Sequence, residues 1–390
     1  MAGLTKIEDA PTPEVSIESH AQTLADGINK PVAGRHEAPK ITNRQSGARD
    51  STVHASQTAP GKPFGIPVSG WRERSKISNK VHILGDNPRS RFLAYALKGK
   101  FDSIRWVERP NQRNPVVHVA LPAANGDLQT MRNTALPRRG APHYDTDPIK
   151  NLIVMTSASQ TVEAIDSIRH RLTDETVMCL MQDRLGVVEA VDEKLAEKEE
   201  TKKPAYIVGH MSQAYRYDQD LKAVVEKSKG RVGVTAVSLS GTDTGGLKAD
   251  VALVKDNPAT ANFISKICTT DHIKGAGYTF QRWLYMKLPT VVFLSVVEPL
   301  CVVLGCRYDE LMHNKWGHVL MQQLLAEISQ VVLALPEVQQ FPGIQTAFTG
   351  EGIRKMVYDK IRAKGKAPGF MAMQIERGFG TDIDFLTATL

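Results

Sequence analysis

Two short polar segments are the places where this sequence could do chemistry. Each directly follows an apolar run: Thr156 to Gln160 follows Leu152 to Met155, and Gln182 to Gly186 follows Val177 to Met181. In an open α/β sheet, ligands bind beyond the carboxyl ends of the strands. If the two runs are strands, both polar segments lie at the same edge of one sheet. The sequence therefore predicts a ligand site there.

The stretch from 151 to 189 has the pattern of the elements that would position this site. Both apolar runs are short enough to be buried parallel strands, and Ser157 or Ser159 can cap a helix between them. The apolar face of that helix is formed by residues at helical spacing: Val162, Ile165, Ile168 and Leu172. We therefore expect a βαβ unit of the nucleotide-binding type.

A third candidate segment is the loop that follows an expected first strand at residues 80 to 85. A dinucleotide-binding loop needs the pattern G-x-G-x-x-G, and only Gly85 of the three glycines is present. Asn87 tolerates a left-handed backbone and Ser90 is small, but Asp86 adds a negative charge and Pro88 removes an amide donor. We expect cofactor-binding positions at Gly85, Asn87 and Ser90, with weakened binding.

The central stretch resembles the ketopantoate reductase family, the NADPH-dependent 2-dehydropantoate 2-reductases, and most closely the fungal type. The shared segments are LIV, QT, RLT, MQ, LG and VVE within residues 151 to 189, and a C-terminal pattern over residues 369 to 384. The resemblance implies an α/β class protein: a Rossmann-like doubly wound parallel sheet, then an all-helical 6-phosphogluconate-dehydrogenase-like C-terminal domain. It also implies hydride transfer from NADPH to a 2-oxo acid, which gives a 2-hydroxy acid.

The resemblance also indicates which residues occupy the functional positions of the family. Ser157 stands where the family has a lysine, and Asp183 stands in place of the asparagine of a Gln-Asn-Gly turn. Glu298 precedes Pro-Leu, where the family has a substrate-binding Asn or Asp, and Asp382 replaces the catalytic glutamate. Arg109 matches an arginine that meets the 2′-phosphate of NADP. A firm catalytic set does not follow, because several of these residue types differ.

Two hypotheses about function follow. A neutral serine at 157 has neither the charge nor the reach of lysine, and losing one oxyanion donor typically costs ~3 kcal/mol. Phe370 and Arg184 replace a serine and a glycine. We predict a pseudoenzyme retained as a binding or assembly protein, with RNA or a ribonucleoprotein as partner because the net charge is +7. The alternative is a divergent NADP-dependent 2-dehydropantoate 2-reductase that uses Asp382, Lys287 and a reshaped cofactor loop.

Composition predicts three regions. Residues 1–78 are rich in Pro, Gly, Ser and Thr and lack apolar periodicity, so we expect a disordered N-terminal extension. Residues 79–256 should form the Rossmann-like NADP-binding-type domain, and residues 257–390 the helical domain. The most apolar window, Leu288 to Gly305, contains Glu298-Pro299 and is expected to be a buried helix pair rather than a membrane span. A helical stripe of core residues is expected further on: Leu320, Leu324, Ile328, Val331 and Leu335.

Other function classes are disfavoured. The four cysteines lack the spacing of a zinc site, and His313 and His318 do not have the spacing of a metalloprotease helix, so we predict no metal. A secretory segment is not evident and we expect no membrane partner. The expected compartment is the cytoplasm or the mitochondrion. The sequence does not indicate an oligomeric state.

Overall fold

A computed structural model of the protein describes residues 77–107, 117–122, 128–133, 146–197, 203–239, 247–249, 251–339 and 341–383. Most of the predicted N-terminal extension (residues 1–76) and Arg109 lie outside the described residues. The elements below all belong to the part of the chain after residue 76.

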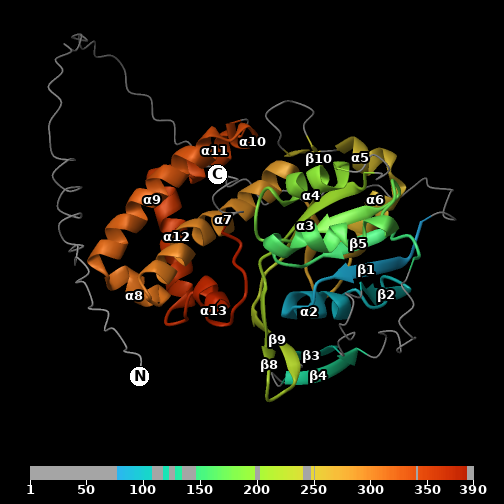
Figure 1. Ribbon diagram of the computed structural model, residues 1–390, viewed down its shortest axis with the longest axis horizontal. Coiled ribbons are helices and arrows are strands. Elements are labelled where there is room, and N and C mark those ends of the chain that lie inside the picture. The colour runs from blue at the N-terminus through green and yellow to red at the C-terminus, as the bar shows by residue number, and fades with distance from the viewer. Residues whose placement is uncertain are drawn as a thin grey trace, which may run out of the picture. The chain divides into compact units, whose positions relative to one another are not determined.

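The main sheet has eight strands in the order β11-β10-β7-β6-β5-β1-β2, with β12 pairing to β10 (Figure 1). The strands are β1 (Lys80–Leu84), β2 (Ser103–Trp106), β5 (Asn151–Val154), β6 (Val177–Leu180), β7 (Ala205–Met211), β10 (Val232–Leu239), β11 (Leu247–Ala249) and β12 (Gly275–Gly277). Strands β2, β1, β5, β6 and β7 run parallel, and β10 runs antiparallel to β7. The predicted parallel sheet is confirmed, with an antiparallel addition at one edge.

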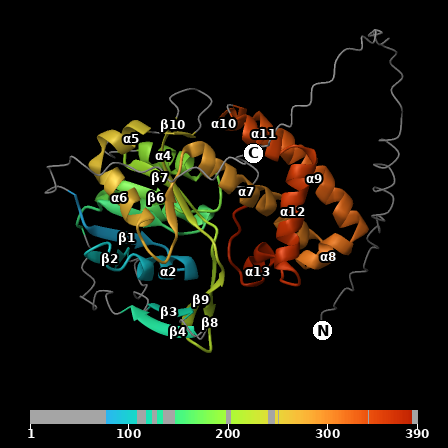
Figure 2. The same cartoon turned by 180° about the vertical axis from the view of Figure 1, so that it is seen from behind.

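Helices cover both faces of this sheet, which is why its central strands β5 and β6 are almost entirely apolar. Leu152 and Val154 of β5 face a core shared with α3 (Ala158–Asp166), α4 (Val187–Ala196) and the later helices. Ile153, between them, faces a second core shared with α2 (Pro88–Ala96) and α6 (Pro258–Cys268). Figure 2 shows this second face from behind, with α6 lying across it. Because β1, β5 and β6 run parallel, the residues that follow them all lie at the carboxyl edge of the sheet.

A separate four-stranded sheet, in the order β4-β3-β9-β8, packs against α2. Its strands are β3 (Val117–Pro122), β4 (Leu128–Asn133), β8 (Ala214–Asp218) and β9 (Ala223–Ser228). The ring of Tyr215 stacks on Phe92 of α2 with centroids 4.2 Å apart. Sequence analysis did not predict this sheet.

The C-terminal region is helical: α7 (Phe280–Val303), α8 (Tyr308–His313), α9 (Lys315–Ala334), α10 (Pro336–Gln339), α11 (Pro342–Ala347), α12 (Gly350–Lys364) and α13 (Phe370–Glu376). Before it come α5 (Val251–Asp256), α6 and β12, and both α6 and β12 pack on or pair with the main sheet. The sheet layer thus continues past residue 257, and the position of the domain boundary stays a prediction.

The predicted helix pair over Leu288 to Gly305 is wrong, because α7 is a single helix with Pro289 and Pro299 inside it. The buried carboxylate of Glu298 is tolerated because it accepts hydrogen bonds from the Tyr308 hydroxyl and the Met371 amide. By length and composition, α7 is the one helix of the described chain that could cross a membrane. However, 56% of its most apolar stretch is buried inside the protein, as in the core helix of a soluble protein.

The predicted apolar stripe of α9 is partly wrong. Leu320 is 41% exposed, and the fully buried row instead contains Met321, Leu325 and Val332. Leu324 and Ile328 pack at the margin of the core. Two adjacent rows of α9 are apolar, so periodicity alone could not tell which one faces inward.

Candidate functional site at the carboxyl edge of the sheet

The loop after β1 is held tightly against the loop after β5. Gly85 has φ +109°, and a Cβ at this position would lie 2.8 Å from the carbonyl carbon of Met155 and the amide nitrogen of Thr156. Both the backbone angle and the lack of space require glycine. The first glycine of the predicted loop is therefore present for a structural reason.

The N-terminus of α2 is capped by its own residues. The Asn87 side chain accepts a hydrogen bond from the Ser90 amide (3.0 Å), and the Ser90 hydroxyl accepts one from the Asn87 amide (2.9 Å). Asn87 Nδ2 also donates to the Met155 carbonyl (2.5 Å). Pro88 occupies the first turn and has no N–H. Of the amides that a phosphate could use at this helix end, one is absent and one is already bonded.

The loop after β5 meets the far end of the chain. Ser157 is the N-cap residue of α3 but makes no capping bond, and its hydroxyl lies 3.3 Å from that of Ser159. The carboxylate of Asp382 accepts a hydrogen bond from the Ser159 amide (3.0 Å) instead. An acidic group at this end of α3 is favoured by the helix dipole. Asp382 thus ties the last described residues to the sheet edge.

The turn after β6 presents Asp183 to the loop after β1. One carboxylate oxygen of Asp183 lies 2.5 Å from Arg89 Nη1. Burial raises the pKa of Asp183, but the nearby charges of Arg89 and Lys287 outweigh that effect and leave the pKa lowered. Asp183 is therefore ionised in the folded protein.

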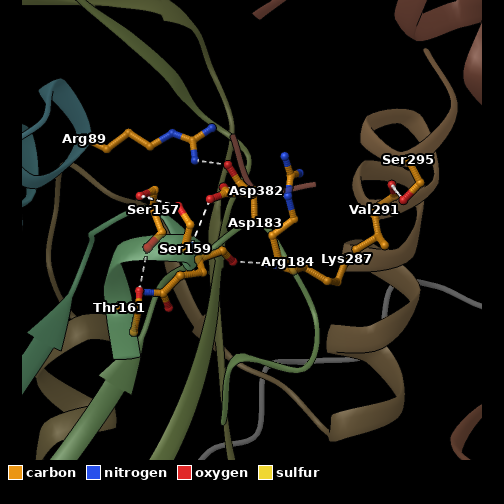
Figure 3. A network of polar contacts seen from close by, with 11 residues as sticks. Arg89, Ser157, Ser159, Thr161, Asp183, Arg184, Lys287, Val291, Ser295 and Asp382 are labelled. Atoms are coloured by element: carbon orange, nitrogen blue, oxygen red, sulfur yellow. Dashed lines mark hydrogen bonds and ion pairs between the residues drawn. The ribbon is translucent and has the colours of Figure 1, made fainter. Parts of the chain in front are cut away.

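Arg184 is the next residue and is buried almost completely. Its side chain is 5% exposed, and its Nε lies 3.8 Å from a carboxylate oxygen of Asp382 (Figure 3). Among the described residues, neither its Nε nor its Nη1 has a hydrogen-bond partner. Burial lowers the pKa of Arg184, and the charge of Asp382 opposes that shift.

Lys287 reaches the same edge from α7. It is fully buried, and its Nζ donates a hydrogen bond to the Gln182 carbonyl at the end of β6. Burial lowers the pKa of Lys287 to about 8, although the charge of Asp183 works in the opposite direction. Nearby on β7, burial lowers the pKa of His210 to about 3, so this ring is neutral near pH 7.

A small crevice lies at this edge. A crevice of about 20 Å³ is lined by Gln182, Arg184, Trp283, Lys287 and apolar side chains of β6, α4 and β7. A volume of this size holds about one water molecule.

Three of the residues that occupy functional positions of the family, Ser157, Asp183 and Asp382, thus lie together at the carboxyl edge of the main sheet. Glu298 is bonded elsewhere, to Tyr308 and the Met371 amide. The functional roles predicted for these residues, and for Gly85, Asn87 and Ser90 in the adjoining loop, stay predictions. Sequence analysis missed both ion pairs at the edge, although an adjacent Asp and Arg after a buried strand could have signalled them.

Comparisons with known proteins identify the family. The model of the family described as "Ketopantoate reductase PanE/ApbA" matches residues 81–233, and that of "Ketopantoate reductase PanE/ApbA C terminal" matches residues 282–390. The chain belongs to the ketopantoate reductase family. A 2-dehydropantoate 2-reductase of Saccharomyces cerevisiae is 25% identical over 171 residues, which span 43% of this chain and 44% of that protein. This match covers less than half of either protein.

Solved structures of ketopantoate reductases and of a D-mandelate dehydrogenase share the fold. A family member from Ralstonia eutropha JMP134 is 11% identical with a TM-score of 0.55, and covers 80% of this chain and 89% of its own. A 2-dehydropantoate 2-reductase from Geobacter metallireducens GS-15 is 15% identical with a TM-score of 0.53, covering 80% and 91%. D-mandelate dehydrogenase, solved with NADH and anilino(oxo)acetate, is 12% identical with a TM-score of 0.53, covering 80% and 90%. At these identities the likeness concerns the fold alone.

Proposed function

We propose that this ketopantoate reductase-like protein is catalytically degenerate and is retained as a binding or assembly protein. The observation that carries this proposal is the self-capped N-terminus of α2. A nicotinamide dinucleotide needs free amides there for its pyrophosphate, but Pro88 offers none and the Ser90 amide is bonded to Asn87. Asp86 adds a negative charge, which Arg91 neutralises through contacts of 2.6 and 2.9 Å. The donors at this loop do not fit a dinucleotide.

The ion pair between Arg89 and Asp183 supports the same conclusion. It links the first turn of α2 to the turn after β6, and so crosses the carboxyl edge of the sheet. A dinucleotide that ran along this edge would have to displace the pair. Separating partly buried charges and leaving either one unpaired is costly.

Cofactor binding tests the proposal directly. We expect NADPH to bind with a dissociation constant weaker than ~1 mM, or about 4 kcal/mol of binding, and no NADPH oxidation with ketopantoate. A double variant, Asn87→Gly with Pro88→Ala, should bind NADPH more tightly because it frees one amide and restores another. Ser157→Lys alone should not create activity. Micromolar binding of NADPH to the unmodified protein, measured by calorimetry, would overturn the proposal.

RNA, free or in a ribonucleoprotein, is the partner class that we propose. The net charge of +7 supports it, as does the hairpin of β8 and β9. Residues 214–231 carry five basic and three acidic side chains, and the exposed basic ones are Arg216, Lys222, Lys227, Lys229 and Arg231. Tyr217 is partly exposed beside them and lies under the Arg91 guanidinium, 5.6 Å from ring centroid to Cζ. Basic side chains with an aromatic ring suit single-stranded RNA.

Fluorescence anisotropy with single-stranded RNA at several salt concentrations tests this partner. Replacing Lys227 and Lys229 by glutamate should weaken binding by about tenfold or more and reduce the slope of log K against log salt by roughly 1.4. The matched control replaces Lys355 and Lys366, basic residues of the helical region, and should change binding little. Equal effects of the two double variants, or no salt dependence, would exclude the hairpin as an RNA surface.

Lys287 favours a second candidate, a divergent NADP-dependent 2-dehydropantoate 2-reductase. Its ammonium is buried at the carboxyl edge, and its pKa of about 8 leaves a proton that a developing alkoxide could accept. The D-mandelate dehydrogenase of this fold was solved with NADH, which supports a nicotinamide cofactor for such a reaction. Turnover of ketopantoate that is abolished by Lys287→Met or Asp382→Ala, but kept in Lys355→Met, would establish this candidate instead.

A further inference from the structure

A pocket lies at the C-terminal end of α2, at the edge of the main sheet opposite the candidate site. The parallel strands β1 and β2 are joined through α2, so the start of this helix lies at the carboxyl edge and its end lies at the amino edge. The pocket has a volume of about 170 Å³ and is lined by Tyr95, Ala96, Lys98, Lys100, Asp271 and His272. One water needs only ~10–15 Å³, so there is room for a small ligand.

The basic groups of this pocket suit an anion with two charges. Lys98 and Lys100 supply two ammonium groups, and neither is ion-paired among the described residues. The turn that carries them is fixed by hydrogen bonds from the Lys98 amide to the Tyr95 carbonyl (3.1 Å) and from the Lys100 amide to the Leu97 carbonyl (3.0 Å). A phosphate monoester carries about 1.5 to 2 negative charges near pH 7. It matches this pair of lysines better than an internal phosphodiester, which carries a single charge.

The opposite wall of the pocket comes from the loop after α6, which supplies Asp271 and His272. The His272 ring lies against the Tyr95 ring, with centroids 5.6 Å apart. Aromatic side chains of this kind are stacking surfaces for bases. The carboxylate of Asp271 disfavours a second phosphate, but it can accept hydrogen bonds from ribose hydroxyls. Phosphate, sugar and base are thus each matched by a different group, which together suit a ribonucleotide with one phosphate.

The pocket also adjoins the hairpin of β8 and β9, which we propose as an RNA surface. Tyr217 of β8 lies under the Arg91 guanidinium of α2, and Tyr95 is one helical turn further along the same helix. The opposite wall is tied to the hairpin as well, because the Gln213 side chain donates a hydrogen bond to the Ile273 carbonyl (3.2 Å). Figure 1 shows α2 next to these strands. An RNA strand on the hairpin can therefore reach the pocket with one of its ends.

We infer that this pocket binds the terminal, phosphate-bearing nucleotide of an RNA strand. Lys98 and Lys100 hold the phosphate, Asp271 accepts from the ribose, and the rings of Tyr95 and His272 contact the base. The inference rests on the proposed RNA function as far as the strand is concerned. Binding of the nucleotide itself does not depend on that function, so the two can fail separately.

Mononucleotides test the pocket without RNA. We expect AMP to raise the melting temperature of the full chain in a saturable way, with much smaller shifts from adenosine and from inorganic phosphate. Replacing Lys98 and Lys100 by glutamine should weaken AMP binding by about tenfold or more, because it removes two charge-assisted hydrogen bonds. The matched control replaces Lys227 and Lys229 by glutamate and should bind AMP like the unmodified protein. The inference is overturned if AMP gives no shift, if its shift equals that of adenosine or phosphate, or if the glutamine variant binds AMP unchanged.

Three RNAs of one sequence test the strand: one with a 5′-phosphate, one with a 3′-phosphate and one with hydroxyls at both ends. In fluorescence anisotropy, we expect one of the phosphorylated RNAs to bind about tenfold more tightly than the hydroxyl RNA, and the glutamine variant to lose this preference. The glutamate variant of the hairpin should weaken all three RNAs and keep the preference. Equal binding of the three RNAs would refute the inference and leave the RNA surface intact. Binding of AMP without binding of any RNA would refute the strand as ligand, and with it the proposed RNA partner.

Discussion

Replacing Lys287 by methionine should stabilise the protein. Methionine has nearly the volume of lysine and no charge, and position 287 is fully buried. Two favourable contacts of the Nζ would be lost: the hydrogen bond to the Gln182 carbonyl and the cation–π contact with the Trp283 ring, whose centroid is 5.8 Å away. The variant therefore measures whether the free-energy cost of burying this ammonium exceeds the stabilisation from its contacts.

The magnitude follows from the shift in pKa. The pKa of Lys287 falls from 10.5 to about 8 on folding, mainly because of burial. Each pKa unit corresponds to ~1.4 kcal/mol, so burying the charged form costs about 3 kcal/mol. Losing the hydrogen bond and the contact with the Trp283 ring costs roughly 1–2 kcal/mol. We expect Lys287→Met to raise the free energy of unfolding by about 1–2 kcal/mol at pH 7.

The dependence on pH has a definite sign. Below pH 8 the side chain is charged in both states and the full cost applies, whereas between pH 8 and 10.5 only the unfolded chain keeps its proton. The unmodified protein therefore recovers stability relative to the variant as the pH rises through this window. Urea unfolding of both proteins at pH 7, 9 and 10.5, in a buffer without carboxylates, measures the difference. Lys355→Met is the exposed control.

A result of the opposite sign would refute this reasoning. If Lys287→Met is less stable than the unmodified protein at pH 7, by an amount that does not vary with pH, then the contacts of the ammonium outweigh its burial.

Three further substitutions test separate parts of the structure. Burial lowers the pKa of His210 to about 3. As the pH falls from 6.5 to 5, only the unfolded chain therefore binds a proton at this ring. In urea unfolding, the unmodified protein should lose up to ~1.4 kcal/mol of stability per pH unit relative to His210→Gln. Gly85→Ala should lower the melting temperature much more than Gly99→Ala. Both positions have positive φ, but only a Cβ at position 85 would clash with backbone atoms. Equal losses would show that the close contact between Gly85 and the loop after β5 is unimportant. Asn87→Ala should destabilise the protein by about 2 kcal/mol, because it removes both the helix cap and the hydrogen bond to the Met155 carbonyl, and Asn87→Gly by somewhat less. A larger loss in the glycine variant would contradict the capping role.

The βαβ unit could be predicted from sequence because its signals are local. The runs at 152–155 and 177–181 alternate between two covered faces, so every position is apolar, and the helix between them shows a clear 3.6-residue period. The continuous α7 was missed because proline usually ends a helix. Here the helix continues through Pro299. The carboxylate of Glu298, the preceding residue, accepts hydrogen bonds from the Tyr308 hydroxyl of α8 and the Met371 amide of α13. Those partners follow only from the tertiary structure.

The contacts of the candidate site could not be predicted, because they join segments far apart in the chain. Asp382 bonds to the Ser159 amide across 223 positions, and Lys287 bonds to the Gln182 carbonyl across 105.

Sequence analysis placed Ser157 where the family has a lysine, and named Lys287 as part of a divergent reductase only in the alternative hypothesis. In the structure an ammonium is present at the carboxyl edge, supplied by α7. A substitution at one aligned position therefore does not establish that a charge is missing from a site, because a distant element can supply it. The proposal of a degenerate reductase therefore rests on the N-terminus of α2 rather than on position 157. There Pro88 and the Asn87 cap leave fewer amides for a cofactor.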